Sequence, residues 1–172
     1  TCNEALEIDP YNSGSWNNKG LALASLGRCE EAIKAYDNAT QIDPQFSDSW
    51  IYKGDALCDL DNYEGAIKAY DEAIKIDPQY ADAWNNKGFA FYKLGKYEDA
   101  LKAFNRTIEI KPDMDLGWYN RACIYSLISN KEQAIVNLKK AIELNSSYKE
   151  TAKKDDDLKG LWMNEEFKKI TT

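Results

Sequence analysis

The sequence predicts an all-α protein built from repeated pairs of antiparallel helices. Four tryptophans lie 34 residues apart, at Trp16, Trp50, Trp84 and Trp118. All four prolines keep the same interval, at Pro10, Pro44, Pro78 and Pro112. Two unrelated residue types that share one period indicate a repeated structural unit. Apolar residues at three- and four-residue spacing inside each unit predict two helices per unit.

The second unit illustrates how each pair of helices is predicted. Trp50, Gly54 and Leu57 fall on one face of a first helix, and polar residues 61–62 interrupt the pattern. A second apolar stripe then ends at Pro78, because proline disfavours helical geometry in the residue before it. The same reading of all four units predicts helices near residues 14–26, 30–42, 48–60, 64–76, 82–94, 98–110, 116–128 and 132–144, with a short helix at each end.

Small and bulky residues alternate with the same period. Four residues after each tryptophan stands a small residue, namely Gly20, Gly54, Gly88 and Ala122. Alanine follows sixteen residues after each tryptophan, at Ala32, Ala66, Ala100 and Ala134. Four residues further on are the bulky residues Tyr36, Tyr70, Phe104 and Leu138. Because glycine inside a helix costs roughly 0.5–1 kcal/mol relative to alanine, its recurrence indicates close helix packing.

The predicted domain is continuous and has partial units at both ends. The full units cover residues 13–46, 47–80, 81–114 and 115–148. Residues 1–12 align with the second helix of a unit, which predicts a remnant of a preceding repeat, an excerpt of a longer array, and an apolar edge prone to weak self-association. Residues 149–172 are expected to form a capping helix and tail, in which the aspartates at 155–157 are solvated. The apolar residues of this tail are expected to pack against the fourth unit or to dock into another molecule, and they are Leu158, Leu161, Trp162, Phe167 and Ile170.

Composition excludes several classes of function. The formal net charge is −7, which argues against binding nucleic acid or an anionic membrane surface. No segment reads as a membrane span or a signal peptide, so a cytoplasmic location is expected. The chain contains no histidine and no phosphate-binding loop, so we expect neither catalysis nor a cofactor or metal. The four scattered cysteines are interpreted as free thiols, with a metal site or disulfide as the alternative.

The repeat resembles the tetratricopeptide family. Three units read W-x-x-K-G and the fourth reads W-x-x-R-A, each followed by the recurring alanine and the bulky residue. Proline closes the first three units, and the fourth has Ser146 in its place. Lys19, Lys53, Lys87 and Arg121 replace the usual leucine, and we expect their stems to lie on apolar surface while their charges stay hydrated. The resemblance covers residues 13–148. It implies a right-handed superhelix, an α-solenoid, whose first helices line a concave groove.

The resemblance also implies which positions face the groove. They are the second, fifth, sixth, ninth, twelfth and thirteenth of each unit. The candidate peptide-binding residues are Asn17, Asn18, Asp48, Tyr52, Asp55, Asp82, Asn85, Asn86, Phe89, Tyr119 and Asn120. Further groove positions fall on Leu21, Ile51, Asp59, Tyr92, Leu116 and Cys123.

Asparagine recurs at the sixth position, in Asn18, Asn86 and Asn120. Its amide can bond both polar groups of a peptide backbone, although simple duplication of a solvated residue explains the recurrence equally. A family variant that clamps a terminal carboxylate has basic residues where this chain has Asn17, Asp82 and Asn86, so that clamp is absent.

Two functions of different kinds remain open. The first is an adaptor that binds an extended peptide or protein segment in the groove, and the aspartates favour a neutral or basic partner. The second is a structural module that assembles through its ends or its convex face.

Overall fold

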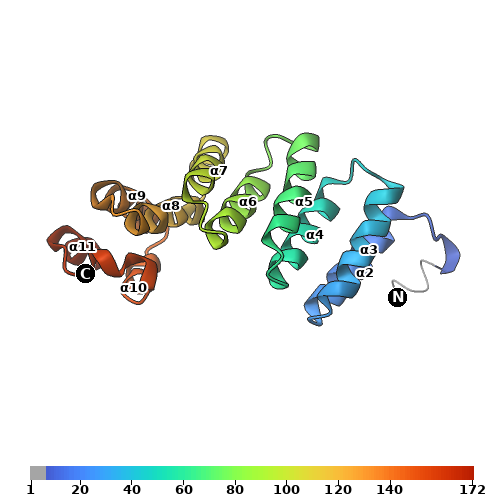
Figure 1. Ribbon diagram of the computed structural model, residues 1–172, viewed down its shortest axis with the longest axis horizontal. Coiled ribbons are helices and arrows are strands. Elements are labelled where there is room, and N and C mark those ends of the chain that lie inside the picture. Colours follow the sequence, from blue (N-terminus) through green and yellow to red (C-terminus); the bar gives the residue numbers. More distant parts are fainter. Residues whose placement is uncertain (1–6) are drawn as a thin grey trace. The chain divides into compact units, whose positions relative to one another are not determined.

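The computed structural model describes residues 7–172, and every regular element in that range is a helix. The first helix runs antiparallel to the second in the first, second and fourth predicted units (Figure 1). The four pairs are α2 (Ser13–Ser25) with α3 (Cys29–Ile42), α4 (Ser47–Asp59) with α5 (Tyr63–Ile76), α6 (Ala81–Lys93) with α7 (Tyr97–Ile110), and α8 (Asp115–Leu127) with α9 (Lys131–Leu144). These bounds confirm the predicted helices to within one residue. The remnant helix predicted for residues 1–12 includes Ala5 and the residues around it. Residues 1–6 lie outside the described part of the chain, so this prediction falls partly outside it.

The chain divides into two compact units. Unit 1 ends at Ala90 and unit 2 spans residues 91–172, so the division falls inside α6. The core of unit 1 gathers alanines and tyrosines of α3, α4 and α5, including the fully buried Ala66 and Ala73. The core of unit 2 includes Ala100 and Phe104 of α7 and a larger cluster around α8 and α9.

Within a pair, a glycine of the first helix lies directly against a tyrosine ring of the second. A Cβ atom added at Gly20 would lie 2.7 Å from Cδ1 of Tyr36. One added at Gly54 would lie 2.8 Å from Cδ1 of Tyr70. Both distances are shorter than the closest approach of non-bonded carbon atoms, so only glycine fits at these two positions. The predicted reason for the recurring glycine is therefore confirmed in these two pairs.

The turn between the two helices of every unit uses a left-handed residue. The φ angles are 71° at Gly27, 55° at Asp61, 70° at Gly95 and 63° at Ser129. A left-handed residue after a helix lets the next amide satisfy a carbonyl of the last turn, as when Asn62 N–H donates to Leu57 O at 2.8 Å. Asp61 and Ser129 adopt this conformation despite having a Cβ.

The two periodic markers, tryptophan and proline, contact each other. Trp50 Nε1–H donates to Pro44 O at 3.2 Å, and Trp118 Nε1–H donates to Pro112 O at 2.9 Å. The corresponding bonds of Trp16 and Trp84 complete the series. Each bond fixes a first helix to the end of the preceding second helix, which explains why both residue types keep one period.

The basic residue that replaces the usual leucine lies over the tryptophan of its own unit. Lys53 Nζ lies 5.2 Å from the ring centroid of Trp50 and forms a 2.5 Å ion pair with Asp37 of the preceding unit. Lys87 likewise lies over Trp84 and pairs with an aspartate at 2.6 Å, and its side chain is only 16% exposed. At these two positions the ammonium group contacts both the tryptophan ring and a carboxylate of the preceding unit, and both contacts stabilise the connection between units.

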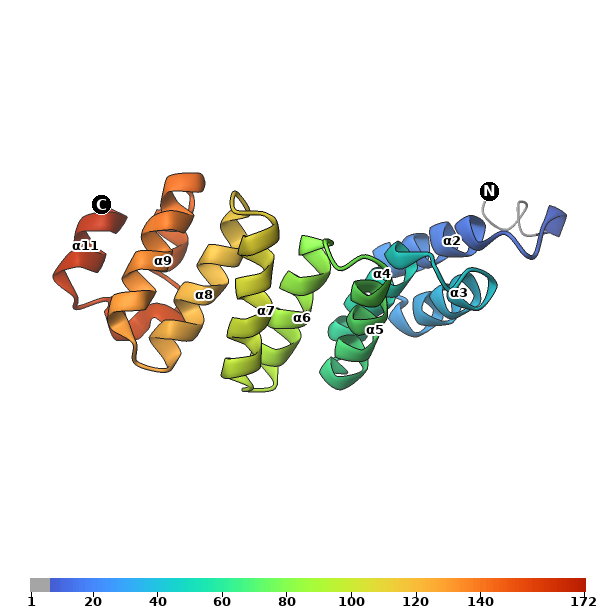
Figure 2. The same cartoon turned by 90° about the horizontal axis from the view of Figure 1, so that it is seen from above.

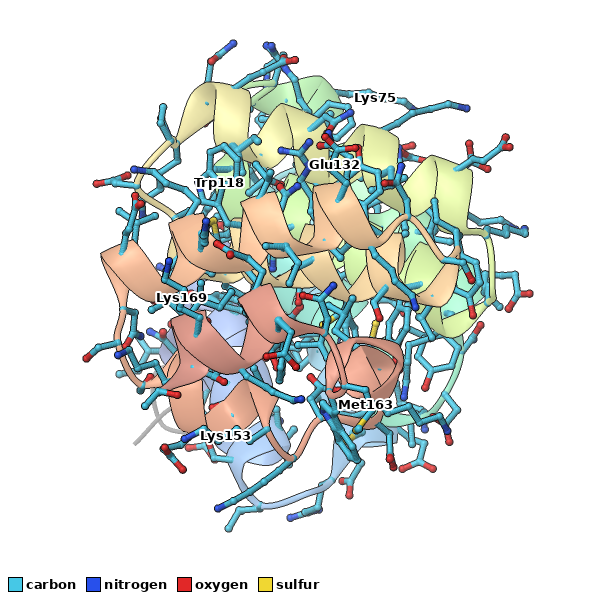
Figure 3. The ribbon with its side chains drawn as sticks, turned by 90° about the vertical axis from the view of Figure 1, so that its left-hand side faces the viewer. Lys75, Trp118, Glu132, Lys153, Met163 and Lys169 are labelled. Atoms are coloured by element: carbon cyan, nitrogen blue, oxygen red, sulfur yellow. The ribbon has the colours of Figure 1, made fainter. Side chains whose placement is uncertain are left out.

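The C-terminal end consists of α10 (Tyr148–Ala152), the 3-10 helix η1 (Asp156–Leu161) and α11 (Glu165–Thr171). It packs against α8 and α9, as Figure 2 shows in orange and red. Leu158, Leu161 and Phe167 are buried in one cluster with α8 and α9, so the packing alternative predicted for this tail is confirmed. Trp162 and Met163 are instead exposed on the outer surface, where Met163 is labelled in Figure 3.

Candidate functional site

Residues at the fifth position of the first helices are buried, which corrects part of the predicted groove. Asn17 is 6% exposed, Asn85 3% and Tyr119 6%. Asn17 Oδ1 accepts a hydrogen bond from Ser49 Oγ at 2.9 Å, which connects α2 to α4. Asn17 therefore connects consecutive first helices, and none of these three side chains offers free surface to a partner in this structure.

The other predicted residues of unit 1 keep some exposure. Asn18 and Asp82 are exposed, and Phe89 is 40% exposed. Tyr52 is half-buried, with its ring centroid 6.1 Å from that of Tyr36. These side chains belong to α2, α4 and α6, the first helices of the pairs that the resemblance assigns to the groove.

A half-buried carboxylate, Asp55, lies at the centre of a polar network in unit 1. Its Oδ1 accepts from Tyr70 Oη–H at 2.7 Å and from Asn86 Nδ2–H at 2.9 Å. Burial raises the pKa of the Asp55 carboxyl above its ordinary value, although these two hydrogen bonds act in the opposite direction. The nearby charges of Asp59 and Asp82 raise it further.

The amide of Asn86 is therefore already engaged. Its Nδ2 donates to Asp55, and its Oδ1 accepts from Asn85 Nδ2 at 3.3 Å. One N–H and one lone pair are left for a ligand. Replacing Asn86 by alanine would therefore also remove a hydrogen-bond donor to Asp55, so this change should lower stability as well as affect a ligand.

Asp48, a second carboxylate of α4, accepts a hydrogen bond from the residue that ends the same repeat. Tyr80 Oη–H donates to Asp48 Oδ1 at 3.1 Å. Burial, followed by this hydrogen bond, raises the pKa of Tyr80 to about 12. Asp48, Asp55, Asp59 and Asp82 thus place four carboxyl groups on α4 and the start of α6, and no ion pair to any of them is seen within residues 7–90.

In unit 2 the predicted groove positions contact the chain's own C-terminal segment. Tyr119 Oη–H donates to Asp155 Oδ2 at 2.6 Å, and Cys123 Sγ–H points to the same oxygen at 3.7 Å. Tyr92 Oη–H donates to Asp157 Oδ2 at 2.6 Å. The expectation that residues 155–157 form a solvated cap is therefore wrong for the two outer aspartates.

Burial dominates the electrostatics of this cluster. It raises the pKa of the Tyr119 hydroxyl, and the hydrogen bond to Asp155 adds to the effect. It also raises the pKa of the Cys123 thiol, which is therefore neutral and unreactive. One potential ligand atom each from Cys123, Asp155 and Asp157 lies within 4.8 Å of the others, but hydrogen bonds from tyrosine hydroxyls already engage both carboxylates.

No sequence pattern directly signals the contact of Asp155 and Asp157 with the repeat. Asp155 and Asp157 lie outside the 34-residue period, so alignment of the units assigned them no partner. The cysteines expected to be free thiols are free among the described residues, namely Cys29, Cys58 and Cys123, while Cys2 lies outside them. In the part of the chain that the structure describes, no helix is long and apolar enough to cross a membrane.

Comparisons with known proteins identify the repeat. Sequence profiles of the tetratricopeptide repeat match residues 14–46, 81–114 and 117–148, and a further profile of the TPR repeat matches residues 54–95. No curated protein matches the sequence significantly.

Several solved structures share the fold. A crystal structure of MamA superposes with a TM-score of 0.80 at 24% identity, covering 87% of both chains. A MamA structure from Desulfovibrio magneticus RS-1, residue 41 to the end, gives 0.77 at 21% identity over 92% of both chains. The first TPR of Spaghetti (RPAP3), bound to the HSP90 peptide SRMEEVD, gives 0.66 at 22% identity over 68% of this chain and 93% of its own.

Proposed function

Because the chain belongs to the tetratricopeptide repeat family, we propose that it is a non-enzymatic interaction module that binds an extended peptide segment along the first helices of unit 1. The tetratricopeptide fold supports a protein-interaction scaffold role in general. The finer proposal is that the segment is neutral or basic, and that α2, α4 and α6 receive it.

The row of carboxylates on α4 and α6 carries this proposal. Asp59 and Asp82 are exposed, Asp48 and Asp55 are half-buried, and no ion pair from within residues 7–90 neutralises them. Such a row attracts a cationic segment and repels an acidic one. The RPAP3 repeat domain was solved with the acidic-ended peptide SRMEEVD, whereas the carboxylate row of this chain favours a partner of the opposite charge.

Asn18, Tyr52 and Phe89 supply the other contacts in this proposal. Asn18 offers an exposed amide to a peptide backbone, and the aromatic rings of Tyr52 and Phe89 offer partly exposed apolar surface. This combination favours an extended backbone with mixed side chains over a folded ligand. Asn120, at the same repeat position in unit 2, stays a candidate contact.

A peptide series tests the charge preference. Three unstructured peptides of equal length carry lysine, glutamine or glutamate at alternating positions, and their affinities are measured by fluorescence anisotropy. We expect the lysine peptide to bind most tightly and the glutamate peptide least, with affinity for the lysine peptide falling as salt is added. The paired change Asp59→Asn and Asp82→Asn should cost about 0.5–2 kcal/mol of that affinity, because each exposed charge contributes about 0.2–1 kcal/mol.

Glu64→Gln is the matched control, because Glu64 is an exposed carboxylate on the second helix α5. It should leave the affinity for the lysine peptide unchanged. Equal binding of all three peptides, or an equal effect of the control, would count against the groove of unit 1.

A second candidate function is self-assembly through the ends. Ile8 and Tyr11 are 86% and 81% exposed, and Met163 is 83% exposed beside Trp162. Exposed apolar groups of this kind can mark contacts between molecules. Sedimentation over a range of concentrations separates the two functions, because a peptide-binding monomer keeps one mass and a stacking module does not.

A further inference from the structure

The C-terminal strap, defined as residues 155–161, lies on helix α8 in a region that the resemblance assigns to a peptide groove. η1 packs against α8. The groups that hold the strap are the hydroxyls of Tyr92 and Tyr119 and the thiol of Cys123. In the repeat these are the twelfth, fifth and ninth positions, so the strap contacts the same set of positions that was assigned to a ligand.

Local helix capping explains only part of this geometry. Asp155 Oδ1 accepts from Asp157 N–H at 3.0 Å and so caps η1. The other oxygen, Oδ2, accepts from Tyr119 and Cys123, which capping does not require. Asp157 is not a capping residue, yet its carboxylate accepts from Tyr92 at 2.6 Å. Two carboxylates two residues apart are therefore each bound by a tyrosine of the repeat.

Two buried leucines of the strap position its bound carboxylates. Leu158 and Leu161 are fully buried in the cluster that contains Tyr119 and Cys123. Asp156, between the two bound aspartates, is exposed. The strap thus presents an Asp-x-Asp-Leu-x-x-Leu pattern in which Asp155 accepts from Tyr119 of α8 and Asp157 from Tyr92 of α6.

We propose that the strap is a built-in ligand of unit 2, and that the surface formed by Tyr92, Tyr119 and Cys123 is a receptor for an acidic Asp-x-Asp segment. While the strap is bound, this surface is closed to a partner. Its charge preference is the reverse of that proposed for unit 1, since neutral donors here receive anionic groups. The proposal does not depend on peptide binding by unit 1, because it concerns a segment of the chain itself.

The chemistry favours carboxylates at these two places. A buried tyrosine hydroxyl needs an acceptor, and a hydrogen bond to an ionised acceptor is roughly twice as strong as one between neutral groups. An asparagine in place of either aspartate keeps the shape and an acceptor oxygen but loses the charge. The contribution of charge can therefore be separated from that of the apolar anchors.

Hydrogen–deuterium exchange on the full chain tests whether the carboxylates hold the strap. We expect Asp155→Asn combined with Asp157→Asn to speed exchange of the strap amides by about tenfold, since two charge-assisted bonds become neutral ones. Tyr92→Phe combined with Tyr119→Phe should do the same from the other side. Asp156→Asn, which removes the same charge from the exposed position, should leave exchange at the wild-type rate.

A peptide copy of residues 153–163 tests the receptor. It should bind the Asp155→Asn, Asp157→Asn protein about tenfold more tightly than wild type, where the strap competes. A peptide copy with asparagine at both aspartates should bind weakly, and adding Tyr92→Phe with Tyr119→Phe should abolish the gain.

Two results would overturn the proposal. One is strap exchange in both double variants that matches the Asp156→Asn control, which would mean that the leucines alone hold the strap. The other is a peptide copy that binds wild type and variant equally. Slow exchange of the amides of α2 to α5 in the same data shows that unit 1 stays folded. Binding of the lysine peptide to unit 1 is measured in the separate anisotropy experiment. Failure of one proposal is thereby distinguished from failure of the other.

Discussion

Replacing Gly54 by alanine should destabilise the protein, although alanine is the better helix former. The new Cβ would lie 2.8 Å from Cδ1 and Cζ of Tyr70 and closer still to Cε1, whereas ordinary contact begins at 3.4 Å. The ring cannot move away freely, because Tyr70 is 1% exposed and its hydroxyl is bonded to Asp55 at 2.7 Å. Overpacking of this kind costs about 1–3 kcal/mol, and the gain in helix propensity offsets about 1 kcal/mol of it.

The fourth unit suggests the matched control. There the small position is Ala122 and the bulky one is Leu138, and both are fully buried in the same cluster. Making the same pair in the second unit, Gly54→Ala with Tyr70→Leu, should relieve the overlap. A double-mutant cycle should give a favourable coupling of about 1–3 kcal/mol between the two changes.

Urea unfolding followed by circular dichroism at 222 nm measures all four proteins of the cycle. A Gly54→Ala variant more stable than wild type by the full gain in helix propensity, about 1 kcal/mol, would refute the claim that close contact with the tyrosine ring requires glycine at this position. So would a coupling of zero, because the cost would then arise from the helix itself and not from Tyr70.

Three further changes test a contact between consecutive units, a turn between helices and the polar network around Asp55. Lys53→Met should lower the free energy of unfolding by about 1 kcal/mol, since it removes the ion pair with Asp37 and a cation–π contact; urea unfolding at two salt concentrations checks this. Ser129→Gly should raise the melting temperature, because a left-handed conformation costs a residue with a Cβ about 1 kcal/mol. The pKa of Asp55 is raised in the folded protein, so its protonated form stabilises the fold fully when the pH is below the ordinary pKa of about 3.9. This contribution is lost as the pH rises through the pKa of the folded state. Asp55→Asn should therefore gain stability relative to wild type as pH increases from about 4 to 7, which unfolding curves over that range measure.

The helices and their pairing could be predicted from the sequence because two independent markers repeat. Trp118 and Pro112 keep the period for a physical reason, a hydrogen bond between the indole N–H and the proline carbonyl. Gly54 recurs because a tyrosine ring lies against it. Signals of this kind are local in the repeat and are repeated four times, so they are visible without a structure.

The candidate site could be predicted only in part. Position five reads as a groove position in the repeat, but Asn17 and Asn85 are buried, and a polar residue type gives no sign of this. The contacts of Asp155 and Asp157 depend on how a non-repeating segment folds back on α8. They join residues 36 and 65 positions apart, and no period in the sequence relates them.

The most direct test of the account is to map the peptide on the protein by NMR. The lysine peptide is titrated into isotope-labelled full chain, and shifts of backbone amide signals are followed. The account predicts saturable shifts at Asn18, Tyr52 and Asn86 on the first helices of unit 1, with little change on α3 and α5. Shifts confined to the second helices, or no shifts at saturating peptide, would contradict it.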